Sequence, residues 1–334
     1  MKWKVTLGVL LSVLFLWLAF RHANLGEVWA AVRSARYIWM IPMVAITMVS
    51  FALRAWRWRY LFPGTRPSFG PLFRSTLIGF MGNNVLPARL GELMRVYAIG
   101  QSAGASRSVA LGSIVIERIL DMGMLLVLFA IVTSAGRLPA EVRSWGLYLL
   151  LIAGPILLGV VIFHSASERI LPWLERLLPR VIRARVLQMA TNFREGLGVL
   201  GRPRDLVLAT GLSLLMWGSL VGVVVCGFHS LGLELPTDAG VIVLVVMAIG
   251  TMIPSAPGFI GTLQYAGTLA LKQYGVDPSL ALSFTLIYHA SQWFPVTGLG
   301  FFYFVRQQMS LKGLVAADSG RPSGTPIPRG IGRG

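Results

Sequence analysis

Residues 83–99, NNVLPARLGELMRVYAI, interrupt an apolar stretch with charged side chains spaced as in an anion site. Pro87 favours the first turn of a helix, where its missing N–H costs nothing. A helix beginning there would point its free N–H groups and positive dipole end into the break. Arg89 adds a guanidinium matched to phosphate oxygens, and Glu92 lies three residues from both Arg89 and Arg95, within helical pairing reach. The pattern predicts a phosphate site whose arginines are held by Glu92.

Two amides come just before this break. Asn83 and Asn84 are expected to satisfy backbone groups that a broken helix leaves unpaired inside a membrane. The alternative is a short cytoplasmic amphipathic helix with ordinary salt bridges.

A second group of charges, Glu117, Arg118 and Asp121, lies in IERILDMG near the start of a later apolar run. At the centre of a bilayer each charge costs about 2.5–3.5 kcal/mol, so three unpaired charges are implausible there. Glu117 and Asp121 are four residues apart and share a helix face. We expect them to point inward to a basic partner, Arg89 or Arg95. Such a pair could equally be structural and lock the broken region to this helix.

A second break, IPSAPGFIG, resembles the first. PARLGEL at 87–93 and PGFIGTL at 257–263 share Pro, a small residue, an aliphatic residue, Gly and Leu at one constant offset. The candidate anion-binding residues here are Pro257, Gly258, Gly261 and Gln264, which supply donors but no charge; a packing kink is the alternative. Similar breaks that open on opposite sides are expected of inverted repeats with a midplane site, although chance similarity over seven positions is an alternative.

The composition indicates which kind of structural element positions these residues. Of 334 residues, 55% are hydrophobic and 13% charged, with a mean hydropathy of +0.70, whereas soluble domains carry roughly 25% charged residues. The chain is predicted to be an all-α polytopic membrane protein with about six full transmembrane helices plus two re-entrant helical hairpins. The crossings are expected at 3–20, 38–56, 109–133, 145–164, 206–229 and 280–304, and the hairpins at 71–100 and 241–272.

Positive charge orients these elements. The Arg-rich segment 166–204 should be cytoplasmic and the acidic loop 230–240 external, which agrees only if both broken regions are hairpins that do not cross. Both termini are then cytoplasmic, in a multi-pass protein of the cytoplasmic (inner) membrane. The run RAWRWR, with Arg54, Arg57 and Arg59, is interpreted as a topology anchor, and 168–198 as a surface helix pair on anionic lipid.

The expected organisation is an integral membrane domain over 1–310 and a disordered cytoplasmic tail over 311–334. The net charge of +17 is assigned to cytoplasmic loops and lipid head groups rather than to nucleic acid, because no recognition motif accompanies it. The chain has one cysteine, scattered histidines and no Walker A, GxSxG, HExxH or DxD motif. We therefore expect no enzyme activity and no cofactor.

Four motifs occur in the order found in the lysylphosphatidylglycerol synthase transmembrane family, the flippase-like group also called UPF0104: RWRYLF, NNVLPARLGELMR, IVIERILD and IPSAPGFIGTLQ. The resemblance spans roughly residues 5–305. It implies a multi-pass lipid-handling domain, which in two-domain members is associated with moving an aminoacylated phospholipid between leaflets. Stand-alone members are linked to lipid-bound saccharide or envelope pathways. The positions that match family motifs are Arg89, Glu92, Arg95, Glu117, Arg118 and Asp121.

The chain departs from the family pattern at Gln264, where the second break usually ends in an acid. This departure weighs against a proton- or cation-coupled step through that carboxylate. The expected function is translocation of an anionic or phosphate-bearing lipid, a membrane phospholipid or a lipid-linked phosphate, bound by Arg89, Arg95 and the two helix starts. The alternatives are a membrane transferase and a non-transporting partner of a separately encoded lipid or glycan transferase.

Overall fold

Helices and the turns between them make up the computed structural model of the chain, with no strand in the part that it describes. That part is residues 2–309 without 63, 65, 135–139, 180–182, 185, 189, 192–193, 195–196, 237 and 254. The predicted all-α class is confirmed. The expected tail at 311–334 lies outside the described residues.

The order of elements repeats once along the chain. The first half comprises η1 (Tyr37–Trp39), α3 (Met40–Leu61), α4 (Phe69–Val85), η2 (Pro87–Arg89), α5 (Gly91–Ala103) and α6 (Arg107–Ser134). The second half comprises α9 (Pro203–Ser230), α10 (Ala239–Met252), η4 (Pro257–Phe259), α11 (Thr262–Lys272) and α12 (Pro278–Arg306). The remaining elements are α1 (Lys2–Phe20), α2 (Leu25–Ser34), α7 (Ala140–Leu177) and η3 (Leu197–Gly201).

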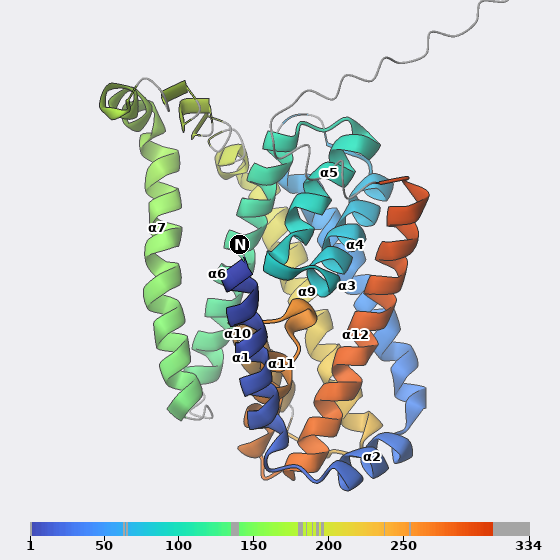
Figure 1. Cartoon of the computed structure of the whole chain (residues 1–334). Helices are drawn as coiled ribbons and strands as arrows, with labels where there is room; N and C mark the ends of the chain where they lie inside the picture. Colours follow the sequence, from blue (N-terminus) through green and yellow to red (C-terminus); the bar gives the residue numbers. More distant parts are fainter. Residues whose placement is uncertain are drawn as a thin grey trace, which may run out of the picture.

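Each half contains a hairpin of two short helices around a break. We call α4–η2–α5 hairpin 1 and α10–η4–α11 hairpin 2. Their arms have 17, 13, 14 and 11 residues, fewer than the roughly 20 that a helix needs to cross a bilayer. Figure 1 shows the two hairpins at opposite ends of the molecule, and η2 contacts η4 between them. The inverted repeat and the side from which each hairpin enters the membrane remain predictions.

The long helices hold the two halves together. α3 packs along α9, its counterpart in the other half, while α4 packs on α12. The largest apolar core lies among α3, α9, α10, α11 and α12 and includes Met43, Met216, Val245 and Phe284. α7 stands to one side (Figure 1) and contacts α6 and α10. The interface between the halves is therefore built around α3, α4, α9 and α12.

Two helices in the described residues are long and apolar enough to cross a membrane, Tyr37–Leu61 and Pro203–Ser230. The pair Gly8–Phe20 and Leu25–Ser34, bent by 82°, passes the same test as one broken span. The six full crossings and the re-entrant character of the hairpins remain predictions.

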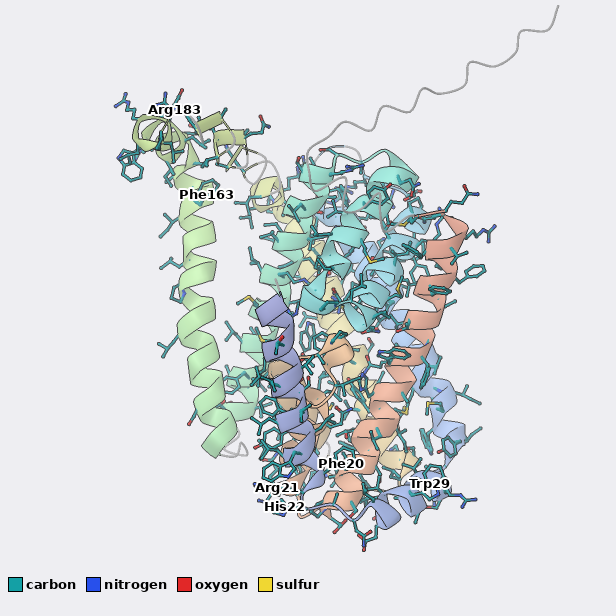
Figure 2. All side chains as sticks on the ribbon, in the orientation of Figure 1. Phe20, Arg21, His22, Trp29, Phe163 and Arg183 are labelled. Atoms are coloured by element: carbon teal, nitrogen blue, oxygen red, sulfur yellow. The ribbon has the colours of Figure 1, made fainter. Side chains whose placement is uncertain are left out.

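One helix was not predicted, and one predicted boundary was wrong. α2 was not predicted; it begins after Asn24, whose side chain accepts a hydrogen bond from the Gly26 N–H, as an N-cap residue does. α7 was expected at 145–164 but runs to Leu177, because the amphipathic sequence after 164 continues the helix instead of starting a separate surface helix. Figure 2 places Arg183 at the end of the molecule where α7 finishes and Arg21, His22 and Trp29 at the opposite end.

Candidate functional site

Glu117 of α6 lies at the centre of a group of buried charges. Its side chain is fully buried, and its Oε2 is 2.8 Å from Nη2 of Arg95. Arg118 Nη2 lies 3.0 Å from Glu117 Oε1. The contact between Arg95 and Glu117 joins α5 to α6, so the expected lock between the first broken region and this helix is present, with Arg95 rather than Arg89 as the partner.

Asp121, one turn further along α6, contacts two arginines of α3. Arg57 Nη1 is 2.6 Å from Asp121 Oδ1, and Arg54 Nη1 is 3.2 Å from Oδ2. Arg57 and its neighbour Trp58 are completely buried, and the Trp58 indole N–H donates to Ser113 Oγ at 2.8 Å. The interpretation of RAWRWR as a topology anchor is therefore wrong for Arg57 and Trp58, whereas Trp56 of the same run is 50% exposed. The signal that could have revealed the two arginines is the spacing of three between Arg54 and Arg57, which places them on one face of an apolar helix.

Glu92 does not pair with Arg89 and Arg95 as predicted. It lies 3.6 Å from Arg118 instead. The prediction assumed one helix from Pro87, but Pro87 opens only a short 3-10 turn and α5 begins at Gly91. Arg89 therefore lies outside the helix that carries Glu92.

We call these seven residues the buried charge cluster: Arg54, Arg57, Arg95, Arg118, Glu92, Glu117 and Asp121. Arg57, Arg95 and Glu117 are fully buried, whereas Arg118 and Glu92 at its edge are 38% and 24% exposed. Within the described part of the chain, four guanidinium groups thus face three carboxylates, which leaves one positive charge in excess. Arg54 has the least close ion pairs of the four arginines, because it donates hydrogen bonds of 3.2 Å to Asp121 and 3.4 Å to Glu117, whereas each of the other three has a carboxylate oxygen within 3.0 Å. Its guanidinium carbon lies 4.8 Å from the centre of the Phe80 ring.

Arg89 joins the two breaks. It adopts a left-handed backbone conformation (φ 54°), as does Phe259 (φ 60°), the corresponding residue of the second break. Arg89 Nη2 donates a hydrogen bond of 2.8 Å to the carbonyl of Thr251, and its guanidinium carbon lies 5.6 Å from the Phe259 ring centre. Arg89 thus links hairpin 1 to hairpin 2, and among the described residues it forms no ion pair with the buried charge cluster.

We expect Arg89→Ala to lower the free energy of unfolding by about 1–3 kcal/mol, because the Thr251 carbonyl loses a charged donor. Arg89→Gly should be more stable than Arg89→Ala by roughly 1 kcal/mol, since glycine adopts a positive φ without steric cost. Unfolding of the two variants in detergent measures both effects. Equal stability of the two variants would contradict the left-handed conformation.

The two asparagines do not have the role predicted for them. Asn84 Nδ2 donates to Thr297 Oγ1 of α12 at 2.9 Å. Asn83 Oδ1 is buried and accepts no hydrogen bond from the residues that the structure describes. The side chain of Asn84 therefore attaches the end of α4 to α12 rather than satisfying the backbone of the break.

The second break is satisfied by its own residues and by α1, whose Ser12 Oγ accepts a hydrogen bond of 2.6 Å from the Ala256 N–H. Gln264 Oε1 accepts a hydrogen bond of 2.8 Å from the Gly261 N–H, and Gln264 Nε2 lies 3.0 Å from His289 Nδ1. Pro257 opens η4, and Gly258 has a φ of 72°. A Cβ at Gly258 would lie 3.0 Å from Trp293 Nε1. Gln264 therefore caps α11 where an anion was expected, and it fixes His289 as an interhelical partner.

A cavity of about 210 Å³, here the central cavity, lies where the breaks meet. Arg54 lines it from α3, Asn84 from hairpin 1, and Thr251 and Phe259 from hairpin 2. Trp217, His289 and Trp293 also line it. The indole N–H of Trp217 has no acceptor among the described residues. The cavity thus combines one cation, aromatic walls and polar side chains from both halves.

The described residues contain no group of three or more His, Cys, Asp or Glu side chains that could hold a metal ion. The site places a cluster with one more guanidinium than carboxylates beside a mostly apolar cavity. This combination suits binding of an anion attached to a hydrophobic body.

The chain is similar in sequence to a family of membrane proteins. Residues 5–300 match the family described as the lysylphosphatidylglycerol synthase TM region. A UPF0104 membrane protein of Methanocaldococcus jannaschii is 27% identical over 235 residues, 68% of this chain and 95% of that protein. A UPF0104 membrane protein of Methanothermobacter thermautotrophicus is 23% identical over 320 residues, 90% of this chain and 94% of that protein.

A third relative is the glycosyltransferase AglD of Haloferax volcanii, 29% identical over 120 residues, which are 35% of this chain and 19% of AglD. No solved structure matches the chain. The match to the family covers both hairpins and every residue of the buried charge cluster. The chain is a membrane protein of the lysylphosphatidylglycerol synthase transmembrane (UPF0104) family.

Proposed function

We propose that the protein moves an anionic, phosphate-bearing lipid between the leaflets of the cytoplasmic membrane and holds the lipid phosphate at Arg54. The observation that carries this proposal is the positive charge in excess at the wall of the central cavity. No bond-breaking step and no cofactor are assigned to the chain.

The charge balance supports an anionic ligand. An ion removed from water is costly unless it is paired, so an internal excess of positive charge favours binding of a negative group. Arg54 is the member of the buried charge cluster that lines the central cavity. A phosphate bound at Arg54 would add a fourth anionic group to the three carboxylates and so balance the four guanidinium groups. This assignment moves the predicted phosphate contact from Arg89 and Arg95 to Arg54, because Arg54 lines the central cavity and the other two do not.

The arrangement of the two halves supports movement of the lipid. Inverted repeats with broken helices and a midplane site are the architecture of alternating-access carriers. In our proposal both hairpins are re-entrant, six helices cross, and both termini are cytoplasmic. Rocking of one half against the other would then expose the central cavity to each leaflet in turn.

Lipid movement in reconstituted liposomes tests the proposal. Labelled lipids that differ in head group are incorporated with purified protein, and movement between leaflets is measured by bleaching of the outer leaflet. Arg54→Gln is expected to slow movement about 10- to 100-fold, because a charge-assisted contact contributes roughly 1.5–3 kcal/mol. Arg54→Lys should retain part of the rate. Arg66→Gln, which removes a partly exposed arginine paired with Asp205, should leave it unchanged.

Arg54→Gln should still fold, since it leaves three cations and three carboxylates in the buried charge cluster. Its melting temperature checks this point. Movement no faster than in empty liposomes would overturn the proposed function. An unchanged rate in Arg54→Gln would overturn the assignment of Arg54 alone.

The similarity to AglD favours a second candidate. A protein named a glycosyltransferase contains a stretch similar to this chain, which fits a non-transporting membrane partner of a separately encoded lipid or glycan transferase. Purification of the tagged protein with a stoichiometric transferase, together with no lipid movement by the purified chain, would favour this candidate.

A further inference from the structure

A second cavity of about 280 Å³, here the lateral cavity, adjoins the central cavity. It lies between α1 and α12, beside the second break. His289 and Trp293 line both cavities, so these two side chains form the wall between them. Side chains of one helix, α12, thus line both cavities.

The lateral cavity differs in chemistry from the central one. Its lining from α1 is Leu16 and Phe20, and Ile260 and Phe294 contribute exposed apolar surface, with 44% and 66% of their area accessible. α1 packs on α11 and on η2, which leaves the space beside α12 to this cavity. In a membrane this opening faces hydrocarbon.

We propose that the lateral cavity binds the hydrocarbon chain of the lipid whose phosphate lies at Arg54, and that the lipid enters between α1 and α12. This inference rests on the proposed function. Continuity at His289 and Trp293 identifies the occupant, because one amphipathic molecule can place its charged end beside Arg54 and its apolar end beside Phe294. Each cavity alone is smaller than the roughly 300–1,000 Å³ of typical small-molecule sites, whereas the two joined reach that range.

Trp293 is the gate in this assignment. Its indole nitrogen lies against Gly258, where an added Cβ would be 3.0 Å away. His289, the other member of the wall, is held 3.0 Å from Gln264. Rotation of Trp293 joins the two cavities without displacing His289. The second break therefore sets the position of both wall residues.

The first step of the test introduces a tether across the opening. In a Cys226→Ser background, which removes the single cysteine, Leu16→Cys and Phe294→Cys are linked by a short bis-maleimide. The matched control links Leu18→Cys to Leu269→Cys, on the α1–α11 side, where both residues line a different cavity. The Leu16–Phe294 tether is expected to slow lipid movement at least tenfold, and the control tether to leave more than half of the rate.

The second step measures binding independently of movement. A phospholipid with a photoreactive group in its acyl chain is expected to label peptides that contain Ile260 and Phe294, and the Leu16–Phe294 tether should abolish this label. Labelling that persists in the tethered protein shows that the chain lies elsewhere and overturns the inference. So does equal movement with and without the tether. If the protein binds the probe at Phe294 but moves no lipid, the proposed function fails while the chain site stands.

Discussion

Replacement of Glu117 with glutamine is expected to lower the free energy of unfolding by about 3–5 kcal/mol, because this is the usual cost of removing one partner from a buried ion pair. Glu117 is fully buried and contacts Arg95 and Arg118 at 2.8 and 3.0 Å. Its loss leaves four guanidinium groups facing two carboxylates. Unfolding of the purified protein in mixed micelles, followed by circular dichroism, measures the change.

The matched control is Glu168→Gln. Glu168 forms a 3.0 Å ion pair with Arg194, but its side chain is 82% exposed, so the same substitution should change stability by no more than about 0.5 kcal/mol. Arg54→Gln should also cost little, because it removes the positive charge in excess. If Glu117→Gln and Glu168→Gln unfold alike, the charges of the buried charge cluster do not depend on one another.

The second large effect is expected from Gly91→Ala in hairpin 1. An alanine Cβ at this position would overlap the carbonyl oxygen of Gly79 and would approach within 2.5 Å of the Asn83 backbone nitrogen. Backbone atoms of α4 cannot move aside as a flexible side chain can. We expect a loss of at least roughly 1–3 kcal/mol, the usual cost of over-packing. Thermal unfolding of the variant measures it.

Gly100→Ala is the control for this prediction, since Gly100 lies on the same helix. The nearest atom to its added Cβ would be 3.4 Å away, an ordinary contact. Glycine costs up to about 1 kcal/mol relative to alanine in a helix interior, so this substitution should stabilise the protein. A Gly91→Ala variant as stable as Gly100→Ala would show that α4 and α5 do not pack at the distance described.

The sequence was sufficient to predict the features that depend on local pattern. Long apolar runs predicted α1, α3, α6, α9 and α12, and Pro87 and Pro257 marked the two breaks. A carboxylate in an apolar helix requires a cation, which is why Arg95 could be anticipated as the partner of Glu117.

The partners of Asp121 could not be predicted in the same way. Alternating arginine and tryptophan is also typical of an interfacial anchor, and only the packing of α3 against α6 shows that Arg54 and Arg57 face inward. The role of Glu92 was mistaken for a different reason. The left-handed conformation of Arg89 separates it from the helix that begins at Gly91, and Arg95, although on the same helix as Glu92, pairs with Glu117 instead.

The repeat has an asymmetry of charge. The shift that maps Pro87 onto Pro257 also maps four members of the buried charge cluster onto uncharged residues; Arg54, Arg57, Glu117 and Asp121 correspond to Val224, Gly227, Ile287 and Ser291. An anion carried as proposed therefore meets a fixed cation in one half only. A difference in lipid affinity between the two conformations determines which of them the bound lipid occupies more often, but it cannot drive net transport at equilibrium. The cluster would thus provide the state in which the lipid is bound most tightly. The direction of net transport would be set by the reaction that supplies the lipid on one leaflet or removes it on the other.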